Sequence, residues 1–219
     1  MSLLKRLLSQ SRKPNGQFGR LLAWGMNFGH SGLTKWGLNF IDIARDTDVL
    51  DIGCGGGRTV ERLAGIALEG NVVGIDYSPD AVLVARKKNR ALIDEGRVEI
   101  FQETVSSMRF SDGAFGLITA FETHYFWPDF RNDLKEVHRV TKQNGQLLIV
   151  GAIYKNEKFD HRNQRIVNVS GMTYLSIEEF QEALEGAGFS EFEAFEEKNK
   201  GWFAVKCKKP DEAPVNIGD

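Results

Sequence analysis

Residues 49–59 read Val-Leu-Asp-Ile-Gly-Cys-Gly-Gly-Gly-Arg-Thr, and this stretch decides the fold. A short apolar run ends in Asp51 and Ile52, a turn with four glycines follows, and a helical pattern begins at Arg58. Glycine has no Cβ, so it adopts positive φ readily and lets backbone N–H groups approach a ligand at a helix N-terminus. A strand, a glycine-rich turn and a helix in this order predict a site for a nucleotide-type ligand.

The spacing of the glycines narrows the class of nucleotide. A dinucleotide-binding turn has the pattern GxGxxG, and its third glycine would fall at Arg58. This turn has the pattern GxGxG instead. Asp76 ends the next apolar run about 20 residues after the glycines, where a carboxylate can accept the ribose hydroxyls.

Four ordered blocks resemble the class I S-adenosylmethionine-dependent methyltransferases. They are DIGCGGG at 51–57, GIDYSPDAV at 74–82, FSDGAFGLI at 110–118 and LKEVHRVTKQNGQLLIV at 134–150. The resemblance covers about residues 45–207 and implies S-adenosyl-L-methionine as cofactor and methyl transfer as reaction. The cofactor-binding positions that it implies are Asp51, Gly53, Cys54, Gly55, Asp76, Tyr77, Ser78, Thr104, Val105 and Phe121.

Strand and helix patterns alternate along the chain, which predicts a parallel sheet with right-handed crossovers. Expected strands are one that ends at 50–52 and others at 71–76, 98–101, 115–121 and 147–153. Expected helices are 58–67, 78–92, 176–186 and one from Pro128, and a hairpin is expected at 191–195 and 202–207. The expected fold class is α/β: a Rossmann-like seven-stranded mixed sheet, its last strand antiparallel as the resemblance implies, with helices on both faces and an N-terminal helical lid. The expected division is a lid at 1–47, a methyltransferase core at 48–207 with an insertion at 154–175, and a flexible tail at 208–219.

Composition indicates the kind of partner. The 219 residues carry a net charge of −2, so the chain lacks the basic field of a sequence-independent nucleic-acid binder. Cys54 and Cys207 form neither a disulfide framework nor a metal-ligand spacing, and no metal is expected. No apolar run reaches membrane-spanning length and no secretory signal is recognisable, so we expect a cytoplasmic protein that acts on a small molecule, with its oligomeric state open.

Residues 1–12 place four leucines on one side of a helix and Lys5 and Arg6 on the other. Such a helix can lie on an anionic membrane surface, but two heptads of leucine are too few for firm membrane affinity. A terminal helix packed on the domain or on a partner subunit is therefore the favoured interpretation.

One position departs from the family pattern. Relatives commonly carry an aspartate followed by alanine after the third strand, where the carboxylate accepts from the adenine amino group. This chain has Thr104 and Val105 there, with Glu103 one place earlier. Either Thr104 accepts the bond or Glu103 shifts to do so, and the backbone N–H of Val105 can still bind the ring.

Residues 121–128, FETHYFWP, follow the fourth strand, where the family places the methyl group and its acceptor. Glu122 or His124 can take a proton from an acceptor, since a general base needs a carboxylate or an imidazole within reach. Tyr125 can orient the acceptor, and Phe126 and Trp127 are interpreted as core.

His30 and Trp36 are candidates for the substrate lid, because the segment around them is dense in Gly, Asn, His and Trp. The chain lacks the Asn/Asp-Pro-Pro-aromatic turn of base amino-methyltransferases and the Pro-Cys of cytosine C5 enzymes, which leaves a small organic acceptor with an O, N, S or C atom to methylate. Two alternatives stay open: a non-catalytic S-adenosylmethionine-binding module and a nicotinamide-dependent oxidoreductase.

Overall fold

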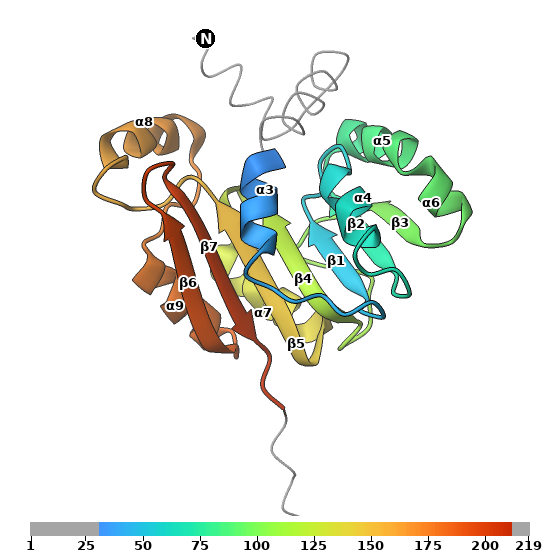
Figure 1. Cartoon of the computed structure of the whole chain (residues 1–219). Coiled ribbons are helices and arrows are strands. Elements are labelled where there is room, and N and C mark those ends of the chain that lie inside the picture. Colours follow the sequence, from blue (N-terminus) through green and yellow to red (C-terminus); the bar gives the residue numbers. More distant parts are fainter. Residues whose placement is uncertain (1–30, 212–219) are drawn as a thin grey trace, which may run out of the picture.

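A computed structural model describes residues 31–211 of the chain (Figure 1). One seven-stranded sheet, in the order β3-β2-β1-β4-β5-β7-β6, runs through these residues. The strands are β1 (Val49–Ile52), β2 (Val72–Asp76), β3 (Val98–Gln102), β4 (Phe115–Phe121), β5 (Thr141–Gly151), β6 (Ser190–Glu197) and β7 (Trp202–Lys208). The central pairs are parallel, and β7 is antiparallel to both β5 and β6. This confirms the expected α/β class and the antiparallel last strand.

Helices cover both faces of the sheet. The helices in the described residues are α3 (Ser31–Leu38), α4 (Arg58–Ala64), α5 (Pro79–Lys88), α6 (Arg90–Asp94), α7 (Phe130–Val140), α8 (Asp160–Ser170) and α9 (Ile177–Gly186), with a 3-10 turn, η1 (His124–Phe126). One core layer joins α7 and α9 to the sheet through Leu134, Val137 and Phe180, all buried. The other joins α3, α4 and α5 to the opposite face through Leu33, Leu63 and Val82.

The parallel register brings several functional candidates to one edge of the sheet. Asp51 lies beside Gly74 of β2 and Thr119 of β4, so the carboxyl ends of β1, β2 and β4 meet there. Ligands of open α/β sheets bind outside the carboxyl ends of the strands, at the point where the strand order reverses. In this sheet the order reverses between β1 and β4, directly beyond which the glycine turn lies.

Several boundaries differ from the sequence-based expectation. The strand expected over 147–153 is β5 over Thr141–Gly151, and the helix expected over 58–67 ends at Ala64. The helix expected over 78–92 is two helices, because Asn89 ends α5 and its amide Nδ2 donates to the carbonyl oxygens of Gly57 and Ala85, 2.9 Å away in each case. The helix expected from Pro128 begins at Phe130, since Asp129 is its N-cap and accepts from the backbone N–H of Asn132.

The N-terminal segment 1–47 lies only partly within the described residues, whereas the insertion 154–175 lies wholly within them. Residues 1–30, which include His30 and the leucine-rich segment, lie outside the described residues, and so do residues 212–219. Within residues 31–47, α3 packs on β5 and β7. The stretch 154–175 contains α8. Over residues 31–211, none of the helices has the length and apolar character needed to cross a membrane.

Candidate active site

The glycine turn is held against the neighbouring strand by its own backbone. The N–H groups of Gly53 and Cys54 both donate to the carbonyl oxygen of Ile75, at 2.8 and 2.9 Å. Gly53, Gly55 and Gly57 have φ values of 70°, 53° and 78°, a region that other residues enter only with strain. The turn therefore has the geometry that the sequence predicts.

Gly53 is also a point of close approach. A Cβ at this position would lie 2.0 Å from Oγ1 of Thr123, which follows β4. A Cβ on Gly55 would meet nothing within 4 Å. The two glycines thus serve different purposes: Gly53 lets two loops touch, and Gly55 leaves open space beside the turn.

Asp76 ties the turn to the start of α5. Its Oδ2 accepts from the backbone N–H of Gly55 at 2.9 Å, and its Oδ1 accepts from that of Ser78 at 2.8 Å. Burial raises the pKa of the Asp76 carboxyl, and these two hydrogen bonds oppose the rise. A carboxylate has about four lone-pair sites, so Asp76 keeps capacity for the hydroxyls of a ribose. Ser78 is fully buried and serves as the N-cap of α5, which defines its visible role.

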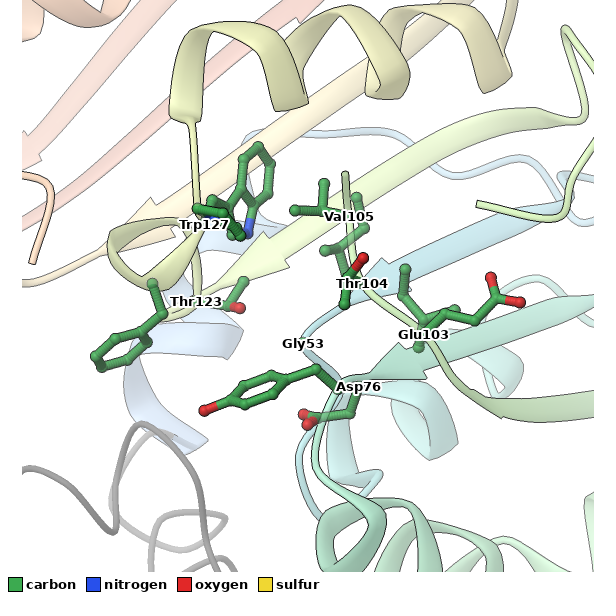
Figure 2. Close-up of a pocket in the computed structure, with 12 residues that line it drawn as sticks. Gly53, Asp76, Glu103, Thr104, Val105, Thr123 and Trp127 are labelled. Atoms are coloured by element: carbon green, nitrogen blue, oxygen red, sulfur yellow. The ribbon is translucent and has the colours of Figure 1, made fainter. Parts of the chain in front are cut away.

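A cavity of about 180 Å³ opens beside Asp76 (Figure 2). Four segments far apart in the sequence form its three walls: the ends of β1 and β2 together, the loop after β3, and the segment after β4. The lining residues are Ile52, Gly53, Ile75, Asp76, Tyr77, Glu103, Thr104, Val105, Thr123, Phe126, Trp127 and Pro128. Of the predicted cofactor-binding residues, the structure brings Gly53, Asp76, Tyr77, Thr104 and Val105 together here.

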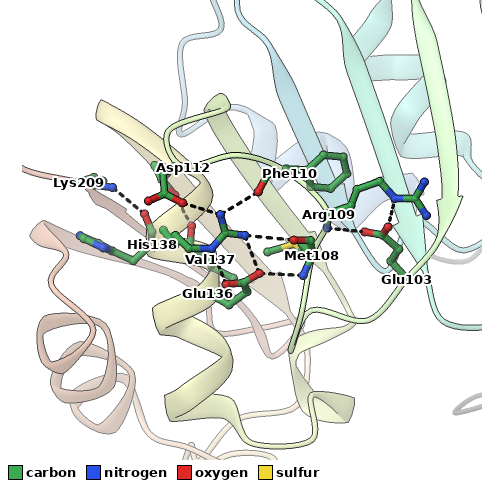
Figure 3. Close-up of polar contacts among 11 residues, drawn as sticks. Glu103, Met108, Arg109, Phe110, Asp112, Glu136, Val137, His138 and Lys209 are labelled. Atoms are coloured by element: carbon green, nitrogen blue, oxygen red, sulfur yellow. Dashed lines mark hydrogen bonds and ion pairs between the residues drawn. The ribbon is translucent and has the colours of Figure 1, made fainter.

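The geometry bears on the choice between Thr104 and Glu103. The Glu103 carboxylate accepts from Nε of Arg109, and the Arg109 guanidinium lies 4.4 Å from the centre of the Phe101 ring (Figure 3). Although atoms of Glu103 line the cavity, its carboxylate is engaged by Arg109. Thr104 is the better-placed of the two to meet an adenine amino group, and this assignment remains a prediction.

Arg139 of α7 fixes the loop that follows Thr104 and Val105. Its guanidinium donates to the carbonyl oxygens of Met108 and Phe110, at 3.2 and 2.8 Å, and to both carboxylate oxygens of Glu136, at 2.8 Å each. Glu136 in turn accepts from the backbone N–H of Met108 at 2.8 Å. One ion pair on a helix thereby holds one wall of the cavity against α7.

Asp51, Cys54 and Phe121 do not line this cavity. Asp51 is buried and accepts from Oγ1 of Thr119 at 2.8 Å, and burial raises the pKa of its carboxyl to about 7. Burial also raises the pKa of the Cys54 thiol well above its usual value, and a Cβ on Gly74 would lie 3.0 Å from the Cys54 sulfur. Cys54 is accordingly a small side chain packed beneath the turn. Phe121 lies against α3, 3.3 Å from where a Cβ of Gly37 would be.

Glu122 and Tyr125 form a hydrogen-bonded pair after β4. The hydroxyl of Tyr125 donates to Oε1 of Glu122 at 2.7 Å and accepts from the backbone N–H groups of Ala152 and Ile153, at 2.8 and 3.3 Å. Burial and the neighbouring Glu122 charge raise the pKa of Tyr125 far above its usual value, so its hydroxyl keeps its proton. Glu122 has a φ of 59°, a strained conformation of the kind that is common at functional sites.

His124 packs against Tyr125 of this pair, inside an aromatic core. Its ring is 1% exposed and packs against the rings of Tyr125, Phe180 and Phe203, and within residues 31–211 neither ring nitrogen has a hydrogen-bond partner. Burial lowers the pKa of His124 to about 3. This position does not favour proton exchange with an acceptor. The geometry therefore favours Glu122 over His124 as the candidate general base.

Trp36, the second lid candidate, belongs to an aromatic cluster on α3. Its ring contacts Phe40 and Trp202, with ring centres 4.9 and 5.9 Å away. It is not among the residues that line the cavity.

Sequence reasoning missed Thr123, Phe126 and Trp127 as lining residues. Phe126 and Trp127 were interpreted as core because a Trp-Pro pair at a helix start usually packs inward. The signal that could have identified them is the glycine turn itself, since a close approach at Gly53 needs a partner and the segment after β4 is its neighbour through the pairing of β1 with β4.

The fold and the site together define the class I, Rossmann-like architecture with a glycine turn, an acidic residue at the end of β2 and a cavity between them. A family model described as "Methyltransferase domain" matches residues 49–145, which include all of these features. Residues 49–145 therefore match a methyltransferase domain, and the comparisons support the class I, S-adenosylmethionine-dependent methyltransferases as the class and S-adenosyl-L-methionine as the cofactor. The recognition and cofactor predictions are confirmed.

Relatives agree with this assignment at two levels. The demethylmenaquinone methyltransferase of Bacillus cereus strain B4264 is 29% identical over 120 residues, which are 54% of this chain and 50% of that protein, so the chain spans about half the length of this curated relative. One chain of the Haloferax volcanii complex of the Trm112 methyltransferase activator superposes with a TM-score of 0.76 at 20% identity, covering 89% of this chain and 95% of that one. A Haemonchus contortus phosphoethanolamine N-methyltransferase superposes with a TM-score of 0.77 at 13% identity, covering 96% of this chain and 61% of that one. The two structural matches show the shared fold.

Proposed function

We propose that the protein transfers a methyl group from S-adenosyl-L-methionine to a small organic acceptor. The observation that carries the proposal is the adjacency of two features: the cavity bounded by Gly53, Asp76 and Thr104, and the pair of Glu122 and Tyr125 on the segment that also forms the cavity wall. The named relatives that act on a quinone or on phosphoethanolamine support a small acceptor.

The proposed cofactor-binding residues contribute either hydrogen bonds or a surface that fits the ligand. Asp76 accepts the ribose hydroxyls, the open side of Gly55 admits the ligand to the backbone of the turn, and the apolar wall of Ile75, Val105 and Phe126 accommodates a flat base. Asp51 remains a proposed binding residue that acts beneath the turn. Because its carboxyl pKa is about 7, it can be protonated or ionised near neutral pH.

The cofactor supplies an electrophilic methyl group, which passes to a lone pair of the acceptor as the carbon–sulfur bond breaks, leaving S-adenosylhomocysteine. Where the acceptor carries a proton, the Glu122 carboxylate takes it as a general base. Tyr125 keeps its own proton and donates to Oε1 of Glu122, which holds the carboxylate in place. The backbone N–H groups of Ala152 and Ile153 fix the Tyr125 oxygen in turn.

The test uses the purified full chain, methyl-labelled cofactor and an extract of small metabolites. We expect label in at least one small organic product and S-adenosylhomocysteine in equal amount. A general base typically contributes a factor of about 100 to 10,000, so Glu122→Gln should lower turnover by about that factor while the affinity for S-adenosylhomocysteine stays within about twofold. Glu196→Gln, on β6, is the control for loss of an acidic side chain.

Three outcomes would contradict the proposal. Cofactor binding with no labelled product would indicate a non-catalytic S-adenosylmethionine-binding module. Thermal stabilisation by NAD in place of S-adenosylhomocysteine would indicate a nicotinamide-dependent oxidoreductase. Unchanged turnover in Glu122→Gln would remove the base role and leave only alignment of the acceptor.

A further inference from the structure

The indole of Trp127 carries a polar group that the fold does not use. The ring is 6% exposed and forms part of the cavity wall. Its Nε1 can only donate a hydrogen bond, and in the part of the chain that is described, no acceptor lies within hydrogen-bond distance of it. Figure 2 shows the nitrogen at the end of the ring that points toward the middle of the cavity.

The surrounding structure holds the indole in this orientation. The backbone N–H of Trp127 donates to the carbonyl oxygen of His124 at 3.3 Å, which closes the 3-10 turn, and Pro128 follows directly. The indole packs against the ring of Phe130, with ring centres 5.6 Å apart. A buried donor without an acceptor destabilises a fold, and a phenylalanine would fill the same space without that penalty. The unpaired donor therefore points to an acceptor that comes with the ligand.

The opposite side of the cavity indicates which part of the ligand this is. Asp76, the ribose-binding candidate, lies across the cavity from Trp127, and the loop of Thr104 and Val105 closes the space between them (Figure 2). A purine base fits an apolar slot and presents accepting ring nitrogens beside its donating amino group. In this chain the Glu103 carboxylate accepts a hydrogen bond from Arg109, so a further side-chain hydrogen bond to the base comes from a residue other than Glu103.

We propose that Nε1 of Trp127 donates a hydrogen bond to an accepting ring nitrogen of the cofactor's adenine. This proposal rests on the function proposed above. Trp127 is then a cofactor-binding residue. Its N–H donates to a ring nitrogen of the adenine, while Thr104 accepts from the adenine amino group. The nitrogen is shielded from water without ligand, so groups around it have to move when the base enters, and the fluorescence of the indole reports this change in its surroundings.

The test compares S-adenosylhomocysteine with its deaza analogues, in each of which one accepting ring nitrogen is replaced by C–H. Affinities are measured by calorimetry for the full chain, for Trp127→Phe and for the control Trp202→Phe, whose ring packs on Trp36 away from the cavity. We expect Trp127→Phe to weaken S-adenosylhomocysteine binding about five- to tenfold, as befits one neutral hydrogen bond. For one deaza analogue, the full chain and Trp127→Phe should bind equally, and Trp202→Phe should match the full chain throughout.

The failures of the two proposals are distinguishable. If the full chain binds none of these adenosyl ligands, the proposed function fails. If it binds them and Trp127→Phe binds S-adenosylhomocysteine as tightly, or loses the same factor for every deaza analogue, the Trp127 hydrogen bond is refuted and the indole is only packing. If Trp127→Phe does not fold, the indole N–H resonances of the intact chain decide: one should move on binding S-adenosylhomocysteine and not on binding the matching analogue, and no such difference overturns the proposal.

Discussion

Replacing Gly53 by alanine should destabilise the protein more than the same change at Gly55, although both glycines have positive φ. The left-handed conformation costs an alanine about 1–2 kcal/mol at either position. At Gly53 the new Cβ would also lie 2.0 Å from Oγ1 and 2.5 Å from Cβ of Thr123, an overlap of the kind that costs about 1–3 kcal/mol. At Gly55 nothing lies within 4 Å. We therefore expect a loss of about 2–5 kcal/mol for Gly53→Ala and about 1–2 kcal/mol for Gly55→Ala.

Urea unfolding of the two variants measures this difference directly, because the effect of alanine on the unfolded chain is common to both and cancels. Thr123→Gly supplies a second check. It removes both overlapping atoms, so Gly53→Ala should cost about 1–3 kcal/mol less in the Thr123→Gly background, whereas Thr123→Ala removes Oγ1, keeps the Cβ and should relieve only part of this cost. Equal unfolding free energies for Gly53→Ala and Gly55→Ala would refute the close approach between the turn and the segment after β4.

Three further predictions concern single side chains. The Asp51 carboxyl has a pKa of about 7 in the folded state against an ordinary value of 3.8, so between these values the folded state binds a proton that the unfolded chain does not, and the free energy of unfolding falls as pH rises from about 4 to 7. Asp51→Asn should remove a slope of about 1.4 kcal/mol per pH unit from this pH dependence. Identical pH profiles for the two proteins would contradict the shift. Asp76→Asn should weaken S-adenosylhomocysteine binding by about tenfold or more in calorimetry, since it replaces a charged acceptor that serves two backbone N–H groups and the ribose; unchanged affinity would remove the ribose role. Arg139→Gln should cost about 1.5–3 kcal/mol in urea unfolding and speed hydrogen exchange at the Met108 amide, and slow exchange there would show that α7 does not hold the loop.

The parts of the fold that depend on local sequence were predictable. The glycine turn, the position of Asp76 and the cap at Ser78 follow from residues within a few positions of one another, and the structure has each of them where the sequence predicts it. The order of strands and helices follows in the same way from the alternation of apolar runs with amphipathic ones. Boundaries were less predictable: the split at Asn89 depends on a bond to Gly57, 32 positions away.

The catalytic segment shows why side-chain direction is harder to predict than position. In residues 121–128, Glu122 or His124 was expected to act as the base and Tyr125 to orient the acceptor. The 3-10 turn that begins at His124 instead directs its imidazole into the core among Phe180 and Phe203, while Phe126 lines the cavity. Which side of such a turn faces the ligand is set by packing against α9 and β7, segments more than 50 positions away in sequence, and no local pattern encodes it.

The three walls of the cavity are each held by a contact that crosses to another part of the sheet. The glycine turn is held by the carbonyl of Ile75, the loop after β3 by Arg139 of α7, and the segment after β4 by the Tyr125 hydroxyl on the backbone that follows β5. Each of these contacts involves a backbone group or the Arg139 side chain, which does not line the cavity. Side chains that face the ligand can therefore change while the segments that form the walls keep their positions. That freedom would allow the proposed polar groups, Thr104 and the Trp127 donor, to stand where the family resemblance implies a carboxylate. It also implies that variants at Arg139 and Tyr125 should affect every ligand of the cavity alike, whereas variants at Thr104 and Trp127 should discriminate between ligands that differ in the base.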